Sequence, residues 1–425
     1  MRVLAVGDLH LGRRPSRLPP ILDERARALG PTGAWRRVVA TAIEHGVDVL
    51  VLAGDVVERE HDFFEAYREL HRGVSRLKDA DIRVLGVAGN HDVAVLPRLA
   101  DELLDFTLLG RDGHWQSVLL KTGSVDLTLH GWSFPARRVH QSPLAEHRFE
   151  PAPGVNLGVL HCDRDQAASA YAPVASQELA QSGLDGWLLG HIHRPDALAA
   201  PNPSGYLGCV TGMDPGEHGV RGPWLLTLAP GRIESVEQWP LAPLHWHRLE
   251  LDIEGLTAPE AARERLLQRL DELDRTLSHA PWVPEAVGLR ISLTGRSALG
   301  EAVRRLFSDN DREHLLSGAR ETHYFIERLD TATRPEIALE ELARREDPPG
   351  LLARRLLLLA RPEGDPERQD LIHTARARLQ LQRSEARFST LQLAPTESDA
   401  AVAATLERAG MHLLDALIAQ RGDAA

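Results

Sequence analysis

Short runs of apolar residues alternate with stretches of helical periodicity in the first half of the chain. Strands buried on both faces read as continuous apolar runs, because both of their faces are covered. A helix is predicted over 35–43, where apolar residues recur every three or four positions, and Gly46 ends it. Strands are predicted over 3–6, 47–53, 82–88, 157–160 and 187–189. This rhythm of strand, helix and strand predicts a layered α/β domain.

Two further regions follow, and their patterns differ from the first. Strands over 245–253 and 287–293, a stripe of leucines at helical spacing and a short helix predict a small α/β unit. From about residue 334 the sequence is charged, and helices are predicted over 351–360, 371–381 and 402–418. We therefore expect three parts, which span residues 1–243, 244–333 and 334–425.

Residues that can bind metals follow each of the five strands predicted in the first part. They stand in the motifs Gly7-Asp8-Leu9-His10, Gly54-Asp55, Gly89-Asn90-His91-Asp92, a single His161 and Gly190-His191-Ile192-His193. In open α/β sheets, ligands bind beyond the carboxyl ends of the strands, where the loops converge. Glycine stands beside four of the five motifs, as a tight turn near a bound ion requires. One such motif alone is usually structural, but five in this order predict a site for two metal ions.

Aspartate, asparagine and histidine are suitable ligands for divalent cations, and no cluster of cysteines competes with them. One carboxylate can bridge two ions, and two ions about 3.5–4 Å apart can clamp an in-line displacement at phosphorus. A nearby histidine that is not a ligand can protonate the leaving oxygen. The residue types therefore favour metal-dependent hydrolysis of a phosphate ester.

These motifs resemble those of the calcineurin-like metallophosphoesterases, whose five blocks stand in the same order. The resemblance implies a four-layer α/β sandwich, with two mixed β-sheets flanked by helices, over about residues 1–240. It assigns one metal to Asp8, His10, Asp55 and His193, and the other to Asp55, Asn90, His161 and His191, with Asp55 as the bridge. It makes His91 the catalytic histidine, oriented by Asp92. Manganese is the expected metal, with magnesium, iron and zinc as alternatives.

A narrower resemblance is to the SbcD-type DNA repair nucleases, in the bacterial branch that pairs with a large SMC-like ATPase. It rests on Asp8-Leu9-His10-Leu11-Gly12, on His130-Gly131-Trp132-Ser133-Phe134 and on residues 205–222 with Asp214-Pro215-Gly216-Glu217. It implies a DNA substrate, a cap that helps to position DNA, and C-terminal helices that dock on the ATPase's coiled coil. Homodimers are typical of the group. Glu58 departs from the pattern where a second aspartate is usual, and His218 departs where a small hydroxyl residue is expected.

Composition limits this hypothesis in two ways. Acidic residues outnumber basic ones by 61 to 49, a net charge of −12. This balance argues against DNA binding by bulk charge, but not against a nuclease whose metals supply positive charge. The two cysteines, Cys162 and Cys209, fit a reducing cytoplasm, and no apolar run approaches the ~18 residues of a membrane span. We therefore expect a cytoplasmic protein that makes no contact with membranes.

Some residues allow more than one interpretation. Cys162 is either an oxidation-sensitive thiol or a buried core residue, and we favour the core residue. Arg13, Arg14 and Arg17 either contact a DNA phosphate or belong to a solvated loop. The C-terminal leucines complete the core of the cap, form a homodimer or bind a partner helix, and the resemblance favours the partner helix.

The sequence therefore predicts a two-metal phosphodiesterase that cleaves DNA as an exonuclease, or at ends and hairpins. A phosphodiesterase or phosphatase for nucleotides or other small molecules is the first alternative. The excess of acidic residues favours this alternative, whereas the two additional parts after residue 243 argue against it. A scaffold that only recruits the ATPase is the second alternative. The complete ligand set opposes it, because a scaffold has no need of His91.

Overall fold

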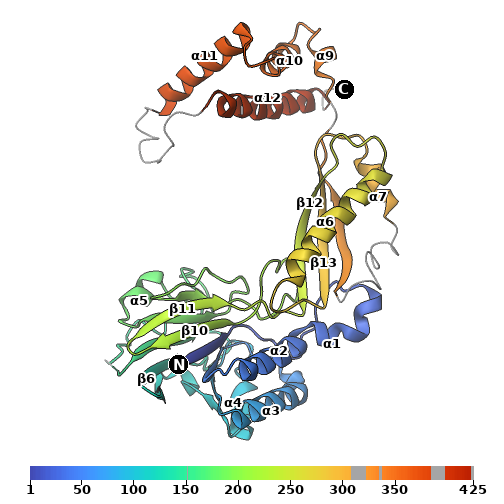
Figure 1. The fold of residues 1–425 in the computed structure, drawn as a ribbon. Coiled ribbons are helices and arrows are strands. Elements are labelled where there is room, and N and C mark those ends of the chain that lie inside the picture. Colours follow the sequence, from blue (N-terminus) through green and yellow to red (C-terminus); the bar gives the residue numbers. More distant parts are fainter. Residues whose placement is uncertain (151, 308–321, 335–336, 384–397, 423–425) are drawn as a thin grey trace. The chain divides into compact units, whose positions relative to one another are not determined.

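The computed structural model describes residues 1–150, 152–307, 322–334, 337–383 and 398–422, which are drawn in Figure 1. They fall into two compact units, one made of residues 1–295 and 299–333 and the other of residues 296–298 and 334–425. The expected limits of the three parts, at residues 243 and 333, stay predictions.

A six-stranded sheet forms the centre of the first unit, in the order β11-β10-β1-β2-β3-β4. Its strands are β1 (Arg2–Val6), β2 (Val49–Ala53), β3 (Arg83–Val87), β4 (Phe106–Leu108), β10 (Trp224–Ala229) and β11 (Arg232–Gln238). Strands β1 to β4 are parallel, whereas β10 and β11 add antiparallel strands beside β1. The three apolar runs predicted as strands here are confirmed as β1, β2 and β3.

A second sheet of five strands has the order β5-β6-β7-β8-β9. Its strands are β5 (Gln116–Thr122), β6 (Val125–Trp132), β7 (Val155–His161), β8 (Gly186–Gly190) and β9 (Ser204–Tyr206). Strands β6 to β9 are parallel, and β5 pairs antiparallel with β6. The remaining two predicted strands of the first part are confirmed as β7 and β8.

The two sheets pack face to face, and helices and loops cover their outer faces. Successive side chains of a strand point to opposite faces, so Val49 and Val51 face the second sheet while Leu50 and Leu52 face the helices. The first sheet is covered by α2 (Pro31–Glu44), α3 (Phe63–Asp79) and α4 (Leu96–Glu102), and the second by α5 (Ser176–Gln181) with loops. The short remaining helices are η1 (Pro20–Arg25), α1 (Ala26–Leu29), η2 (Glu60–Asp62) and η3 (Arg111–Gly113). The predicted four-layer α/β sandwich is confirmed.

A third sheet, of three parallel strands, belongs to the same compact unit. It consists of β12 (Leu244–Asp252), β13 (Ala286–Thr294) and β14 (His323–Thr331), with α6 (Glu260–Ser278) and α7 (Gly300–Leu306) packed on one face. Figure 1 shows α6 lying along β12 and β13. The two strands and two helices predicted in this region are confirmed, and β14 is an addition that the apolar pattern did not reveal.

Trp246 of β12 joins this third sheet to the loop formed by residues 212–219. Its side chain is fully buried, and its indole Nε1 donates a hydrogen bond to the carbonyl oxygen of Gly212 at 3.1 Å. The carbonyl oxygen of Trp246 accepts a second bond, from the amide of Gly219, at 3.2 Å. Both ends of the loop 212–219 are therefore held by one residue of the third sheet.

The second unit is helical, as predicted. It contains α9 (Leu339–Leu342), α10 (Pro348–Leu359), α11 (Pro366–Arg383) and α12 (Asp399–Gly422). Arg296 forms a two-oxygen ion pair with Asp415 at 2.7 and 2.8 Å, and Arg334 contacts the same carboxylate at 2.9 Å. Among the described residues, no helix combines the length and the apolar character that crossing a bilayer requires.

The substitution Gly288→Ala tests the packing around Trp246. A Cβ at position 288 would lie 2.1 Å from the indole ring of Trp246, so the ring would have to move. We expect a loss of about 1–3 kcal/mol of unfolding free energy, measured by thermal unfolding. Ser292→Ala on the same strand is the matched control and should change stability by less than about 0.5 kcal/mol. Equal stability of the two variants would contradict this packing.

Candidate metal centre

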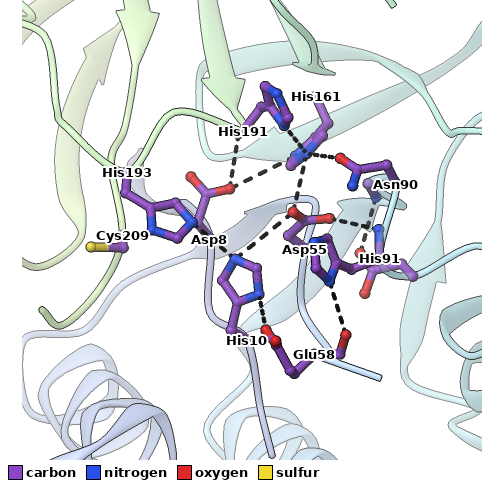
Figure 2. A network of polar contacts seen from close by, with 12 residues as sticks. Asp8, His10, Asp55, Glu58, Asn90, His91, His161, His191, His193 and Cys209 are labelled. Carbon is purple, nitrogen blue, oxygen red and sulfur yellow. Dashed lines mark hydrogen bonds and ion pairs between the residues drawn. The ribbon is translucent and has the colours of Figure 1, made fainter. Parts of the chain in front are cut away.

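The carboxyl ends of β1, β2, β3, β7 and β8 bring all seven predicted metal ligands and His91 to one place. Figure 2 shows their side chains gathered around Asp55. Parallel strands end at the same edge of a sheet, so residues distant in sequence become neighbours there. The structure thus brings together Asp8, His10, Asp55, Asn90, His161, His191 and His193. Their role as ligands stays a prediction.

A first group of possible ligands consists of Asp8, His10 and His193. One ligand atom from each lies within 4.8 Å of the others. The Nε2 atoms of His10 and His193 are 3.1 Å apart. Two imidazole nitrogens that face each other at this distance suit ligation of one shared cation.

A second group consists of Asp55, His161 and His191, and the amide of Asn90 adjoins it. The Nε2 atom of His161 lies 3.3 Å from Asp55 Oδ2, 3.2 Å from His191 Nδ1 and 3.1 Å from Asn90 Oδ1. Asp55 Oδ2 also lies 3.8 Å from His10 Nε2 of the first group. The carboxylate of Asp55 therefore stands between the two groups, as a bridging ligand would.

The electrostatics of the site fit bound cations. Asp8 is fully buried, and its Oδ2 atom has no hydrogen-bond partner. Burial by itself would raise the pKa of Asp55, yet His161 and the other histidines hold it far below its usual range. Burial would lower the pKa of His161, but Asp55 and Asp8 raise it to about 9. A buried carboxylate oxygen without a partner and a strong preference for positive charge fit metal binding.

The backbone at the site is held in an unusual conformation. Asp8, His10, Asp55 and His191 have φ angles of 26°, 50°, 47° and 101°, a region that residues other than glycine rarely adopt. Each such residue costs of order 1–3 kcal/mol, and such residues cluster at functional sites. Gly89 is needed for close approach, because a Cβ there would lie 2.3 Å from Asp55 Oδ1.

Each of the four histidines in the two groups has an acceptor at its other ring nitrogen. Carboxylates contact three of them: Glu58 Oε2 lies 2.8 Å from His10 Nδ1, Glu217 Oε1 lies 2.5 Å from His193 Nδ1, and Asp163 Oδ1 lies 3.3 Å from His191 Nε2. The Nδ1 atom of His161 lies 3.2 Å from the carbonyl oxygen of Ala53. An acceptor fixes which nitrogen carries the hydrogen and directs the other nitrogen toward a metal.

Three of these acceptors are functional residues that the sequence did not identify as such. Glu58 was noted only as a departure from the family pattern, and its position three residues after Asp55 is the available signal. Asp163 stands two residues after His161 in the sequence, close to a motif but outside it. Glu217 was noted only within the motif Asp214-Pro215-Gly216-Glu217 of the narrower resemblance, 24 residues beyond His193, and no local pattern connects it with His193.

Glu217 is held firmly by its own loop. Its Oε2 atom accepts the amide of Met213 at 2.6 Å and that of Asp214 at 3.3 Å. Burial alone would raise its pKa, but the bond with His193 and these amides lower it to about 2. The carboxylate is therefore ionised and fixed in place beside His193.

His91 lies at the edge of the centre and is exposed. Its ring is 5.1 Å from the ring of His10, and its Nδ1 atom lies 2.9 Å from the carbonyl oxygen of Glu58. A carbonyl can only accept, so Nδ1 carries a hydrogen and Nε2 is the nitrogen available to a substrate. Its amide also donates to Asp55 Oδ1 at 3.0 Å.

Asp92 contacts the backbone instead of the ring of His91, which it was predicted to orient. Its carboxylate accepts the amides of Val56, Val57 and Gly89 at 3.0, 2.8 and 3.0 Å. Burial and the charge of Asp55 raise its pKa to about 6. Asp92 thus fixes the turns after β2 and β3, and the carbonyl of Glu58 is what contacts His91.

The structure decides between the alternatives left open for Cys162, whereas those for Arg13, Arg14 and Arg17 stay predictions. Cys162 is fully buried in the core on the outer face of the second sheet, and burial raises the pKa of its thiol. It is therefore a core residue, as favoured from the sequence. Arg13 lies near the centre, because its charge adds to the contact with His10 in lowering the pKa of Glu58, while Arg14 and Arg17 are exposed.

Comparison with known proteins agrees with this geometry. The model of the calcineurin-like phosphoesterase family matches residues 1–195, and that of the middle domain of the metallophosphoesterase YhaO matches residues 246–334. The uncharacterized metallophosphoesterase YhaO of Bacillus subtilis is 26% identical over 227 residues, which cover 51% of this chain and 54% of that protein. The DNA double-strand break repair protein Mre11 of Aeropyrum pernix is 27% identical over 270 residues, which cover 59% of this chain and 64% of that protein.

A crystal structure of the calcineurin-like phosphoesterase YfkN from Bacillus subtilis matches 64% of this chain and 97% of its own, with 12% identity and a TM-score of 0.35. The chain matches between about half and two thirds of the length of the two curated relatives named above. The family model covers the five metal-binding motifs, all of which lie between residues 7 and 193. Residues 1–195 therefore form a domain of the calcineurin-like phosphoesterase family.

Proposed function

We propose that the chain is a nuclease that hydrolyses phosphodiester bonds of DNA with two divalent metal ions, manganese being the expected metal. The observation that carries this proposal is the pair of ligand groups on either side of Asp55, with His91 beside them. The likeness to proteins named for DNA double-strand break repair supports DNA as the substrate. The three-stranded sheet supports it further, because a small-molecule phosphatase needs no such addition.

Asp8, His10 and His193 would hold one ion, and His161, His191 and Asn90 the other, with Asp55 shared between them. Bound ions would stabilise negative charge on the phosphate and activate water for attack on phosphorus. Glu58, Glu217 and Asp163 keep the histidine rings in the orientation that ligation requires. As an imidazolium, His91 would donate the proton on Nε2 to the leaving sugar oxygen and would keep the hydrogen on Nδ1, which bonds to the carbonyl oxygen of Glu58.

The helical second unit is proposed to dock on the coiled coil of an SMC-like ATPase. Its support is a groove of about 890 Å³ between α10, α11 and α12, lined by Leu358, Leu371 and Leu406 among others. Leu351 and Leu413 are also 53% exposed. Exposed leucines on paired helices suit a partner helix. Homodimerisation and a cytoplasmic location stay predictions.

Hydrolysis of end-labelled linear DNA by the full chain with manganese tests the proposed activity. We expect cleavage, and we expect His91→Ala to reduce its rate by about 10²–10⁴-fold, because a general acid contributes on that scale. His71→Ala, an exposed histidine on α3, is the matched control and should cleave like the wild type.

A small chromogenic phosphodiester, assayed beside the DNA, separates the alternatives. Cleavage of the small ester alone, both without and with the ATPase partner, would contradict the nuclease and favour the small-molecule enzyme. Failure to cleave either substrate under both conditions would favour a scaffold.

Substitution of the bridging residue tests the sharing of Asp55. We expect Asp55→Asn to weaken binding of both manganese ions by about 100-fold or more, since loss of a ligand exceeds the 10–100-fold effect of losing an outer partner. Asp8→Asn should weaken the binding of chiefly one of the two ions, and His91→Ala should bind both ions with the wild-type affinities. Isothermal titration calorimetry of the three variants gives stoichiometry and affinity. Two ions bound by Asp55→Asn with the wild-type affinities would rule out the bridge.

Substitution of Glu217 tests the orienting role of the outer carboxylates. Glu217→Gln keeps the shape but removes the charge that fixes His193, so we expect manganese to bind about 10–100-fold more weakly at one of the two sites. Glu250→Gln, an exposed residue of β12, is the control and should leave both affinities unchanged. Calorimetric curves of Glu217→Gln that superimpose on those of the control would contradict this role.

A further inference from the structure

A buried arginine without a counter-charge lies near the metal centre. Arg221 is only 6% exposed, and its Nη1 atom donates to the carbonyl oxygen of its neighbour Val220 at 3.2 Å. Its Nε atom has no hydrogen-bond partner, and in the part of the chain that the structure describes no carboxylate pairs with it. A buried charge is costly unless it is paired, so an anion that is not part of the protein would stabilise this guanidinium.

Several other basic side chains lie around Arg221. The pKa of His218 is lowered by partial burial and then by the positive charges of Arg248, Arg221, Arg194 and Arg290. The pKa of His245 is lowered to about 4 by burial and then by His247, Arg221 and His218. In a chain with a net charge of −12, such a concentration of basic groups is local and specific.

The third sheet adds a row of arginines to this cluster. Arg248 of β12 is in register with Arg290 of β13, which is in register with Arg328 of β14. This row lies on the face opposite to α6, because the alternate residues Leu249 and Ile291 are those that pack in the core with α6. Like charges on neighbouring strands destabilise a sheet. Glu327 and Asp330 pair with the second and third arginines, whereas no described residue pairs with Arg248.

The loop 212–219 places this cluster next to the metal centre. Glu217 contacts His193 of the centre at 2.5 Å, and His218 is the next residue. The amide of Gly219 donates to the carbonyl oxygen of Trp246, so the loop lies against β12, which carries Arg248. The loop that carries His218 therefore contacts both the candidate metal centre and the third sheet.

We propose that Arg221, His218 and Arg248 form a phosphate-binding subsite, which takes a phosphate group of the substrate other than the one that is hydrolysed. This inference rests on the proposed function for its source of phosphate, a neighbouring phosphodiester of the DNA backbone. A guanidinium offers several N–H donors in a fork that fits phosphate oxygens. His218, which departs from the family pattern, thereby gains a role: it adds a donor, and a charge when protonated, where a hydroxyl group is expected.

Equilibrium binding of a short labelled DNA duplex tests the subsite. All variants carry His91→Ala and manganese so that the duplex stays intact, and anisotropy is measured over a series of salt concentrations. We expect Arg221→Gln and Arg248→Gln each to weaken binding about ten-fold and to reduce the salt dependence by about one released ion. Arg83→Gln, an exposed arginine at the amino end of β3, is the control and should change binding less than about two-fold.

One further variant, Arg221→Lys, completes this test. Arg248 is exposed, so its substitution reports on binding without disturbing the core, and Arg221→Lys should retain part of the affinity because it keeps the charge. If the duplex binds, and both glutamine variants bind it like Arg83→Gln, the subsite is overturned while the proposed nuclease stands.

If the wild-type chain binds no duplex, thermal unfolding with inorganic phosphate in the absence of metal tests whether the subsite binds phosphate. A rise in melting temperature for the wild type but not for Arg221→Gln would support the subsite with a free phosphate and contradict the DNA substrate. An equal change in melting temperature for the wild type and Arg221→Gln on addition of phosphate would overturn the subsite.

Discussion

The carboxylate of Asp55 is the contact on which the rest of the site depends. It is buried at the end of β2, where strands of two sheets converge, and it stands between two groups of histidines. Charge buried in this way must be balanced, and the fold supplies ring nitrogens on both sides instead of lysine or arginine. The strained backbone at Asp8, His10 and His191 is the conformational cost of bringing those groups to Asp55.

A ring of outer carboxylates gives this arrangement its rigidity. Glu58, Asp163 and Glu217 each contact a histidine at the nitrogen that faces away from the centre. They come from three different loops, and the loop of Glu217 is itself held by Trp246 of the third sheet. The third sheet thus reaches the candidate metal centre through the loop 212–219, which links the position of this sheet to the geometry of the centre.

The sequence predicted the strands that carry the ligands, because β1, β2 and β3 are buried on both faces and read as continuous apolar runs. Strands β4, β5, β6, β9, β10, β11 and β14 were not predicted. Polar residues at exposed positions interrupt the apolar pattern of β5, β11 and β14, and β4 and β9 have only three residues each, whereas β6 and β10 are largely buried. The ligand set could be predicted because each member directly follows a strand. Glu217 and Arg221 could not be, because an irregular loop brings them to the centre and only the tertiary fold determines where that loop lies. Asp92 directly follows His91 in the sequence, but its carboxylate accepts backbone amides from the turns after β2 and β3 and does not contact the ring of His91.

The measurement that tests the central claim most directly is an anomalous difference map from crystals of the chain grown with manganese. The account predicts two peaks about 3.5–4 Å apart. One should lie beside Asp8, His10 and His193, the other beside His161, His191 and Asn90, and the carboxylate of Asp55 should contact both. A single peak, or two peaks of which only one contacts Asp55, would contradict it.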